Sequence, residues 1–181
     1  MTYEKIGNDK LSKDFYKEGS KYLTTFYGQL SFQKVYPFED FKLNDDTKYS
    51  KDYEKKFNKN PLVSHVILLK ELNKTKYSKD ILKHLAELNI DKGSEVLAAK
   101  LASEIGRYDY AIQISKKASY EKRFYNQFNY PIINTPRVIN GKSMPSQEVV
   151  LAITRQESEF DPKANSYACL LYTSPSPRDQ R

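Results

Sequence analysis

The sequence has one cysteine, two histidines and no tryptophan among its 181 residues. Cys169 has no second cysteine to pair with, which excludes an intramolecular disulfide framework. His65 and His84 are widely separated and leave too few ligands for a zinc site built from cysteine and histidine, so we expect no metal and no cofactor. Apolar stretches such as 149–153 are far shorter than the roughly 18 residues that a membrane helix needs. We therefore expect no membrane span.

Charge and aromatic side chains are abundant instead. There are 30 basic and 23 acidic residues, a net charge of +7, and 15 Tyr with 9 Phe are too many aromatics for a disordered polymer. Lysine accounts for 24 of the 30 basic residues, although arginine is preferred for bidentate contacts with phosphates. Charges of both signs alternate, as in 51–56, which is typical of a solvated helix face. We therefore expect no nucleic-acid partner.

The chain before residue 125 has the apolar spacing of helices. Pro61 is placed at a helix start, Ser78 can cap the next helix, and Gly106 can end the one after that. The turn residues Gly7, Asn73 and Gly106 lie 66 and 33 residues apart, close to multiples of a hairpin repeat of about 34 residues, although the copy expected near residue 40 does not fit.

The fold class predicted from this pattern is all-α. We expect a superhelix of helical hairpins, an α-solenoid, over residues 1–124, and the alternative is an irregular helical bundle. Residues 125–143 contain Pro131, Pro136 and Gly141 and are expected to form a connector. A new helix is expected to begin near Pro145, with Ser143 or Met144 at its cap, and to end before Asp161-Pro162.

One acidic residue of this last helix differs from the others in its position. On a helical wheel Glu157 falls in the same arc as Val149, Val150, Ile153 and Phe160. A carboxylate on an apolar face is desolvated, which raises its pKa and makes it a candidate proton donor near neutral pH. The alternatives are that Glu157 pairs with a basic residue, or that the last turn frays into solvent.

The segment 150–164 resembles the opening of the catalytic domain of soluble lytic murein transglycosylases. The resemblance is carried by Arg155-Gln156-Glu157-Ser158, followed by an aromatic residue and Asp-Pro. Upstream, three further segments resemble the superhelical region of that family: 24–30, 101–112 and the connector around 130–131. The resemblance implies that residues 144–168 begin a lysozyme-like domain carried by the helical region.

The resemblance also implies a reaction and a partner. Glu157 would protonate the glycosidic oxygen between N-acetylmuramic acid and N-acetylglucosamine, and would then act as a base toward the muramoyl C6 hydroxyl. A 1,6-anhydro sugar would result without net hydrolysis, so that one carboxylate suffices where most glycosidases use two. Ser158 matches a family serine that assists substrate positioning, and its alternative is an ordinary exposed serine. The partner would be peptidoglycan, and the location periplasmic or associated with the outer membrane of a Gram-negative bacterium.

The resemblance stops after Ala168. The Gly-Leu-Met-Gln and Ala-Tyr-Asn segments of the family do not follow, and residues 169–181, which contain Cys169, are expected to be a tail foreign to the gene or a Ser/Pro-rich terminus. No apolar segment follows Met1, so we expect no signal peptide and interpret the chain as a fragment. We expect this fragment to be inactive. The alternative from another class is a non-catalytic helical-repeat scaffold that binds partners.

Overall fold

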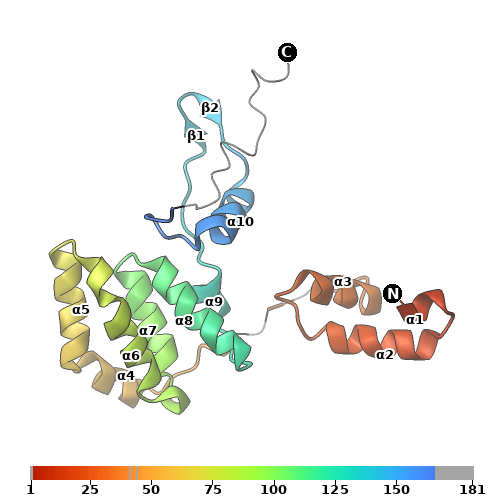
Figure 1. The fold of residues 1–181 in the computed structure, drawn as a ribbon, viewed down its shortest axis with the longest axis horizontal. Coiled ribbons are helices and arrows are strands. Elements are labelled where there is room, and N and C mark those ends of the chain that lie inside the picture. Colours follow the sequence, from red (N-terminus) through yellow and green to blue (C-terminus); the bar gives the residue numbers. More distant parts are fainter. Residues whose placement is uncertain (1, 41, 44, 166–181) are drawn as a thin grey trace. The chain divides into compact units, whose positions relative to one another are not determined.

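The structure, a computed structural model, describes residues 2–40, 42–43 and 45–165 (Figure 1). The tail predicted at 169–181 and the last residues of the segment 144–168 lie outside the described residues. The chain divides into two compact units between Asp45 and Asp46. This division falls inside the region 1–124 that the sequence predicted as one helical array.

The described part of the first unit contains three helices: α1 (Thr2–Lys5), α2 (Asp9–Gly19) and α3 (Phe26–Val35). The hydroxyl oxygen of Thr25 accepts the Gly28 amide at 3.0 Å and caps α3. Gly28 is buried against the carbonyl of Tyr22, where any side chain would collide with backbone. A glycine is therefore required at the point where α3 meets the preceding turn.

The second unit opens with five α-helices, which Figure 1 shows packed together. They are α4 (Lys51–Asn58), α5 (Pro61–Glu71), α6 (Lys79–Glu87), α7 (Ser94–Glu104) and α8 (Tyr108–Tyr120), with two short 3₁₀-helices, η1 (Thr75–Ser78) and η2 (Ile90–Lys92), between them. After α8 come α9 (Asn126–Asn129), the strands β1 (Val138–Ile139) and β2 (Lys142–Ser143), and α10 (Gln147–Ser158).

The core of this unit lies around α7, which packs against both α6 and α8. Ala98, Ala99 and Ala102 of α7 are completely buried, and their small side chains let the neighbouring helices approach closely. Leu82 and Leu85 of α6 are also completely buried against this helix. Residues on all sides of α7 are buried, which accounts for its apolar character around the whole helix.

The three turn residues that set the predicted repeat share one conformation. Gly7, Asn73 and Gly106 have positive φ angles of 74°, 55° and 76°. At each of them the amide donates to the carbonyl three residues earlier, and the next amide donates to the carbonyl five residues earlier. This is the Schellman helix end. Lys122, after α8, has the same pair of hydrogen bonds with a φ of 63° and was not predicted from the sequence.

Two predicted helix starts are met in part. Ser78 lies at the N-cap position of α6 as predicted, but its hydroxyl donates to the Thr75 carbonyl at 2.7 Å and makes no hydrogen bond to the first turn of α6. The helix expected near Pro145 begins at Gln147, with Ser146 at the N-cap position in place of Ser143 or Met144. The predicted start at Pro61 is confirmed, and the Asn60 side chain caps it by accepting the Leu62 amide at 3.0 Å.

The described chain is mostly helical, which confirms the all-α class; the solenoid arrangement stays a prediction. Within residues 2–40, 42–43 and 45–165, the one feature outside that class is a two-stranded antiparallel hairpin in which Val138 pairs with Ser143. Asn140 and Gly141 form its turn with φ angles of 51° and 74°. An Asn-Gly turn with two positive φ angles favours a short hairpin, so the predicted connector contains this element.

Candidate functional site

Helix α10 carries the residues of the candidate site and ends in an unusual way. After Ser158 the next two residues, Glu159 and Phe160, have positive φ angles of 50° and 63°. Non-glycine residues seldom adopt this region, and a bulky aromatic does so even less often. The amide of Asp161 then donates to the carbonyl of Ser158 at 2.9 Å, which closes the turn before Pro162.

Arg155 joins α10 to the helical core. Its Nε donates to the backbone carbonyl of Asn129 at 2.9 Å, and its Nη2 donates to Oδ1 of the same residue at 2.8 Å. The guanidinium also lies 5.8 Å from the ring centroid of Tyr130. Two parallel hydrogen bonds from one planar group determine orientation as well as distance. The sequence analysis matched Arg155 to the motif but predicted no role for it.

Glu159, directly after α10, also links this helix to the preceding helices. Its Oε1 accepts Lys116 Nζ of α8 at 2.9 Å and lies 3.4 Å from Arg155 Nη1. The hydrogen bond from Lys116 to this carboxylate raises the pKa of the lysine. Arginine and glutamate four residues apart lie on one helix face, a spacing that could have predicted this pair from the sequence.

The turn after α10 approaches a second basic residue. Asp161 Oδ1 lies 3.9 Å from Arg107 Nη2, and the same guanidinium binds the buried carboxylate of Asp109. Arg107 also stacks 3.8 Å from the centroid of the Tyr110 ring. The hydrogen bonds to Asp109 raise the pKa of Arg107. The end of α10 is thus held at α8 and α9 by charged groups.

Glu157 lies on the other side of α10. Two residues along a helix correspond to about 200°, so fixing Arg155 toward α9 turns Glu157 away from it. The side chain of Glu157 is exposed and makes no ion pair or hydrogen bond with any residue that the structure describes. The alternative that Glu157 pairs with a basic residue is therefore not observed among the described residues.

The desolvation predicted for Glu157 is not observed either. Val149 and Ile153, which share its arc, are 47% and 56% exposed, and no residue of α10 is buried. The predicted arc also included Phe160, but α10 ends at Ser158 and Phe160 lies beyond it with a positive φ. Val150 and Phe160 are half-buried, whereas Val149, Ile153 and Glu157 are exposed, so Glu157 lacks the apolar cover that the sequence predicted.

Ser158 is half-buried, and its hydroxyl donates to the Thr154 carbonyl at 3.1 Å. This hydrogen bond within the helix orients the side chain along α10. The substrate-positioning role of Ser158 stays a prediction.

In residues 2–40, 42–43 and 45–165 there is no group of three or more histidine, cysteine or acidic side chains placed to hold a metal ion. None of the helices in the same ranges combines the length and the apolar character that crossing a membrane requires. No protein-family model matches the chain, and no curated protein or solved structure matches it either.

Proposed function

We propose that this chain combines a helical scaffold with the opening helix of a peptidoglycan lytic transglycosylase domain, in which Glu157 is the proton donor. The observation that carries the proposal is the division of the motif between two faces of α10. Arg155 and Glu159 bind the scaffold, while Glu157 faces outward, toward the side on which a substrate can approach. A catalytic side chain needs such support from residues that do not react themselves.

The proposed reaction uses one carboxyl group twice. Glu157 donates its proton to the oxygen that links C1 of N-acetylmuramic acid to N-acetylglucosamine, and the C1–O bond breaks. The resulting carboxylate accepts the proton of the C6 hydroxyl, and the C6 oxygen bonds to C1. The products are a free N-acetylglucosamine end and a 1,6-anhydro-muramic acid end, and Glu157 regains its proton. No water is consumed.

A general acid of this kind works near neutral pH only where its surroundings disfavour the charged form. We propose that further helices of the lysozyme-like domain, which the resemblance implies, cover Val149 and Ile153 and enclose Glu157. The 181-residue chain is expected to be inactive on murein for the same reason, since its Glu157 is exposed.

The experiment compares two glutamates of α10. The reading frame is completed from genomic DNA past codon 168, and release of anhydromuropeptides from purified murein is measured by chromatography and mass spectrometry. Glu157→Gln should lower turnover by about 10²–10⁴-fold, the usual contribution of a general acid. Glu148→Gln, an exposed glutamate in the first turn of α10, is the matched control and should retain turnover. Near-normal turnover in the Glu157→Gln protein would refute the assignment.

A non-catalytic scaffold is the second candidate function, and a groove between α6 and α8, lined by Lys79, Lys83 and Lys117, favours it. The same genomic sequence separates the two candidates. A Gly-Leu-Met-Gln continuation after codon 168 supports the transglycosylase, whereas further helical hairpins support the scaffold alone.

A further inference from the structure

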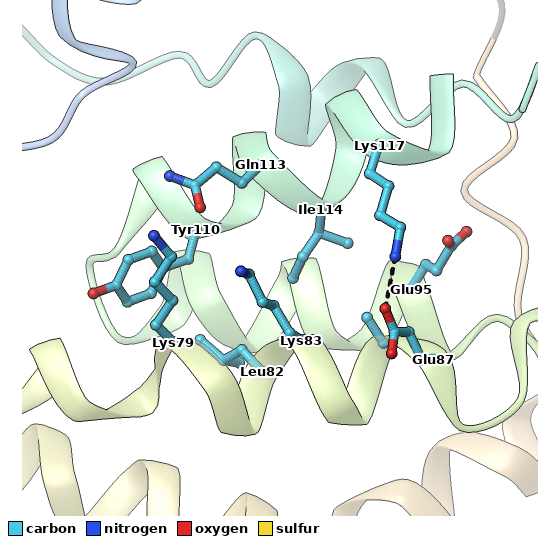
Figure 2. A pocket seen from close by; sticks show the side chains of 10 residues that line it. Lys79, Leu82, Lys83, Glu87, Glu95, Tyr110, Gln113, Ile114 and Lys117 are labelled. Atoms are coloured by element: carbon cyan, nitrogen blue, oxygen red, sulfur yellow. Dashed lines mark hydrogen bonds and ion pairs between the residues drawn. The ribbon is translucent and has the colours of Figure 1, made fainter. Parts of the chain in front are cut away.

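A hollow beside the core lies between α6 and α8, on the helical part of the second unit (Figure 2). It has a volume of about 210 Å³. Its floor is apolar, because Leu82, Ala86 and Ile114 are all buried. The ring of Tyr110, also buried, closes one end.

Lysines line the mouth of this groove. Figure 2 shows Lys79 and Lys83 projecting from α6 toward α8, and Lys117 reaching from α8 to Glu87. Lys79 and Lys83 lie one helical turn apart on the same face of α6. Lys79 is half-buried, with its Nζ 5.9 Å from the centroid of the Tyr110 ring, whereas Lys83 is exposed.

The two acidic residues of the lining form their ion pairs with other basic residues. Glu87 binds Lys117 at 2.6 Å, and Glu95 binds Arg123, which lies outside the lining, at 2.9 Å. Neither Lys79 nor Lys83 forms an ion pair with any described residue. The groove therefore presents two lysines outside any ion pair beside an apolar hollow, with Glu87 near enough to Lys83 for the lysine to help lower the pKa of that carboxyl.

The size and chemistry of the groove restrict what fits it. A volume of about 210 Å³ is below the usual range for drug-sized ligands, roughly 300–1,000 Å³, but suits one large aliphatic or aromatic side chain with a polar neighbour. Lysine attracts an anionic group as a point charge, without the planar fork by which arginine binds carboxylate or phosphate, so the apolar hollow beside the lysines sets the preference for a peptide with an aliphatic side chain. Two arginines contact lining residues, and carboxylates bind both of them: Arg123 binds Glu95, and Arg107, which stacks on Tyr110, binds Asp109.

We propose that this groove binds a short acidic peptide segment, with an aliphatic side chain in the hollow and adjacent carboxylates on Lys79 and Lys83. Tyr110 and Gln113 then frame the peptide from the α8 side. The Lys117–Glu87 pair is more than half exposed on both sides and can rearrange at little cost as the segment enters. The inference does not rest on the transglycosylase activity.

The test uses the 181-residue chain and a fluorescent, end-blocked pentapeptide in which two glutamates flank a leucine, with binding followed by anisotropy. Replacing Lys79 and Lys83 together by glutamine should weaken binding about ten-fold or more, the effect of losing hydrogen bonds between charged partners. The matched control is Lys56→Gln, an exposed lysine of α4, which should leave the affinity unchanged. Binding should also weaken as salt is added, because Lys83 is exposed.

Three results would overturn the proposal. The first is equal binding of the counterpart peptide with two glutamines, and the second is unchanged affinity in the double lysine variant. The third is full displacement of the peptide by inorganic triphosphate at equal concentration, which would make the groove a general anion site. Helical circular dichroism of each variant verifies that the fold is intact.

Discussion

At the scale of single residues, the second unit contains a buried carboxylate whose partners come from the segment after α8. Glu95, in the first turn of α7, is 4% exposed, and Arg123 binds both of its oxygens at 2.9 and 3.0 Å. The Tyr125 hydroxyl donates to the same carboxylate at 3.0 Å. Because every buried oxygen has a partner, the charge is tolerated and joins α7 to the connector.

Tyr125 makes stability depend on pH at the alkaline end. Burial, followed by the hydrogen bond to Glu95, raises the pKa of Tyr125 to about 12. In the unfolded chain a tyrosine titrates near 10, so between about pH 10 and 12 the unfolded state loses a proton that the folded state keeps. The free energy of unfolding should therefore fall as pH rises through this window, by up to about 2–3 kcal/mol from this residue.

Urea denaturation at about pH 9 and pH 11 measures this effect, with Tyr125→Phe as the comparison. The other tyrosines titrate in both proteins, so the informative quantity is the difference between the two. The Phe variant should lose less stability on going to the higher pH. An equal loss in both proteins would contradict the assignment to Tyr125.

At the scale of elements, the Schellman ends of the helices depend on left-handed residues. Gly106 has a φ of +76°, and a Cβ added there would meet no atom within 4 Å, so the cost of a side chain lies in the backbone alone. Gly106→Ala should lower the free energy of unfolding by about 1–2 kcal/mol, measured by urea denaturation. Asn73→Gly, at the equivalent position with a φ of 55°, should not destabilise the protein. Equal destabilisation by the two changes would show that helix-end conformation is not the cause.

The hydrogen bonds that hold α10 against α9 lead to a second prediction. Arg155→Ala removes two hydrogen bonds to Asn129, and a hydrogen bond with one charged partner contributes about 1.5–3 kcal/mol. Amide hydrogen exchange in α10 should rise about ten-fold or more, while exchange in the buried helix α7 stays unchanged. Glu157→Gln is the matched control, since its side chain contacts nothing in the described chain that holds α10 in place. Unchanged exchange in Arg155→Ala would mean that other contacts hold the helix.

The elements that could be predicted from the sequence are those set by residues close together in the chain. Pro61, Gly106 and the apolar spacing around Leu82 act within a few residues, so the helices they mark were found from the sequence. The hairpin at Asn140-Gly141 has only two residues in each strand, too few for an alternating pattern. The role of Arg155 was missed because its partner, Asn129, lies 26 residues away and no local pattern indicates such a contact.

The candidate site was predicted only in part, for a related reason. A helical wheel groups Glu157 with Val149 and Ile153, and the structure keeps them on one face of α10. Whether that face is buried, however, depends on which other segments pack against it. The spacing of residues within α10 does not show this. The predicted desolvation of Glu157 failed for this reason.

At the scale of the whole molecule, the chain consists of a unit of three helices and a larger helical unit that carries α10. The larger unit has two chemically different surface features, on different helices. The groove between α6 and α8 presents lysines around an apolar hollow, and α10 presents a carboxylate beside an apolar arc. In the proposed enzyme, the scaffold therefore both positions the acid and offers a second surface for a partner.

In the proposed reaction, Glu157 drives intramolecular attack by the C6 hydroxyl rather than attack by water. The most direct measurement is digestion of murein in water enriched in oxygen-18 by the completed protein, with mass spectrometry of the released muropeptides. We predict anhydro-muramic ends that contain no label, and their loss in Glu157→Gln. Reducing muramic ends that carry oxygen-18, or anhydro products released equally well by the Glu157→Gln protein, would contradict the claim.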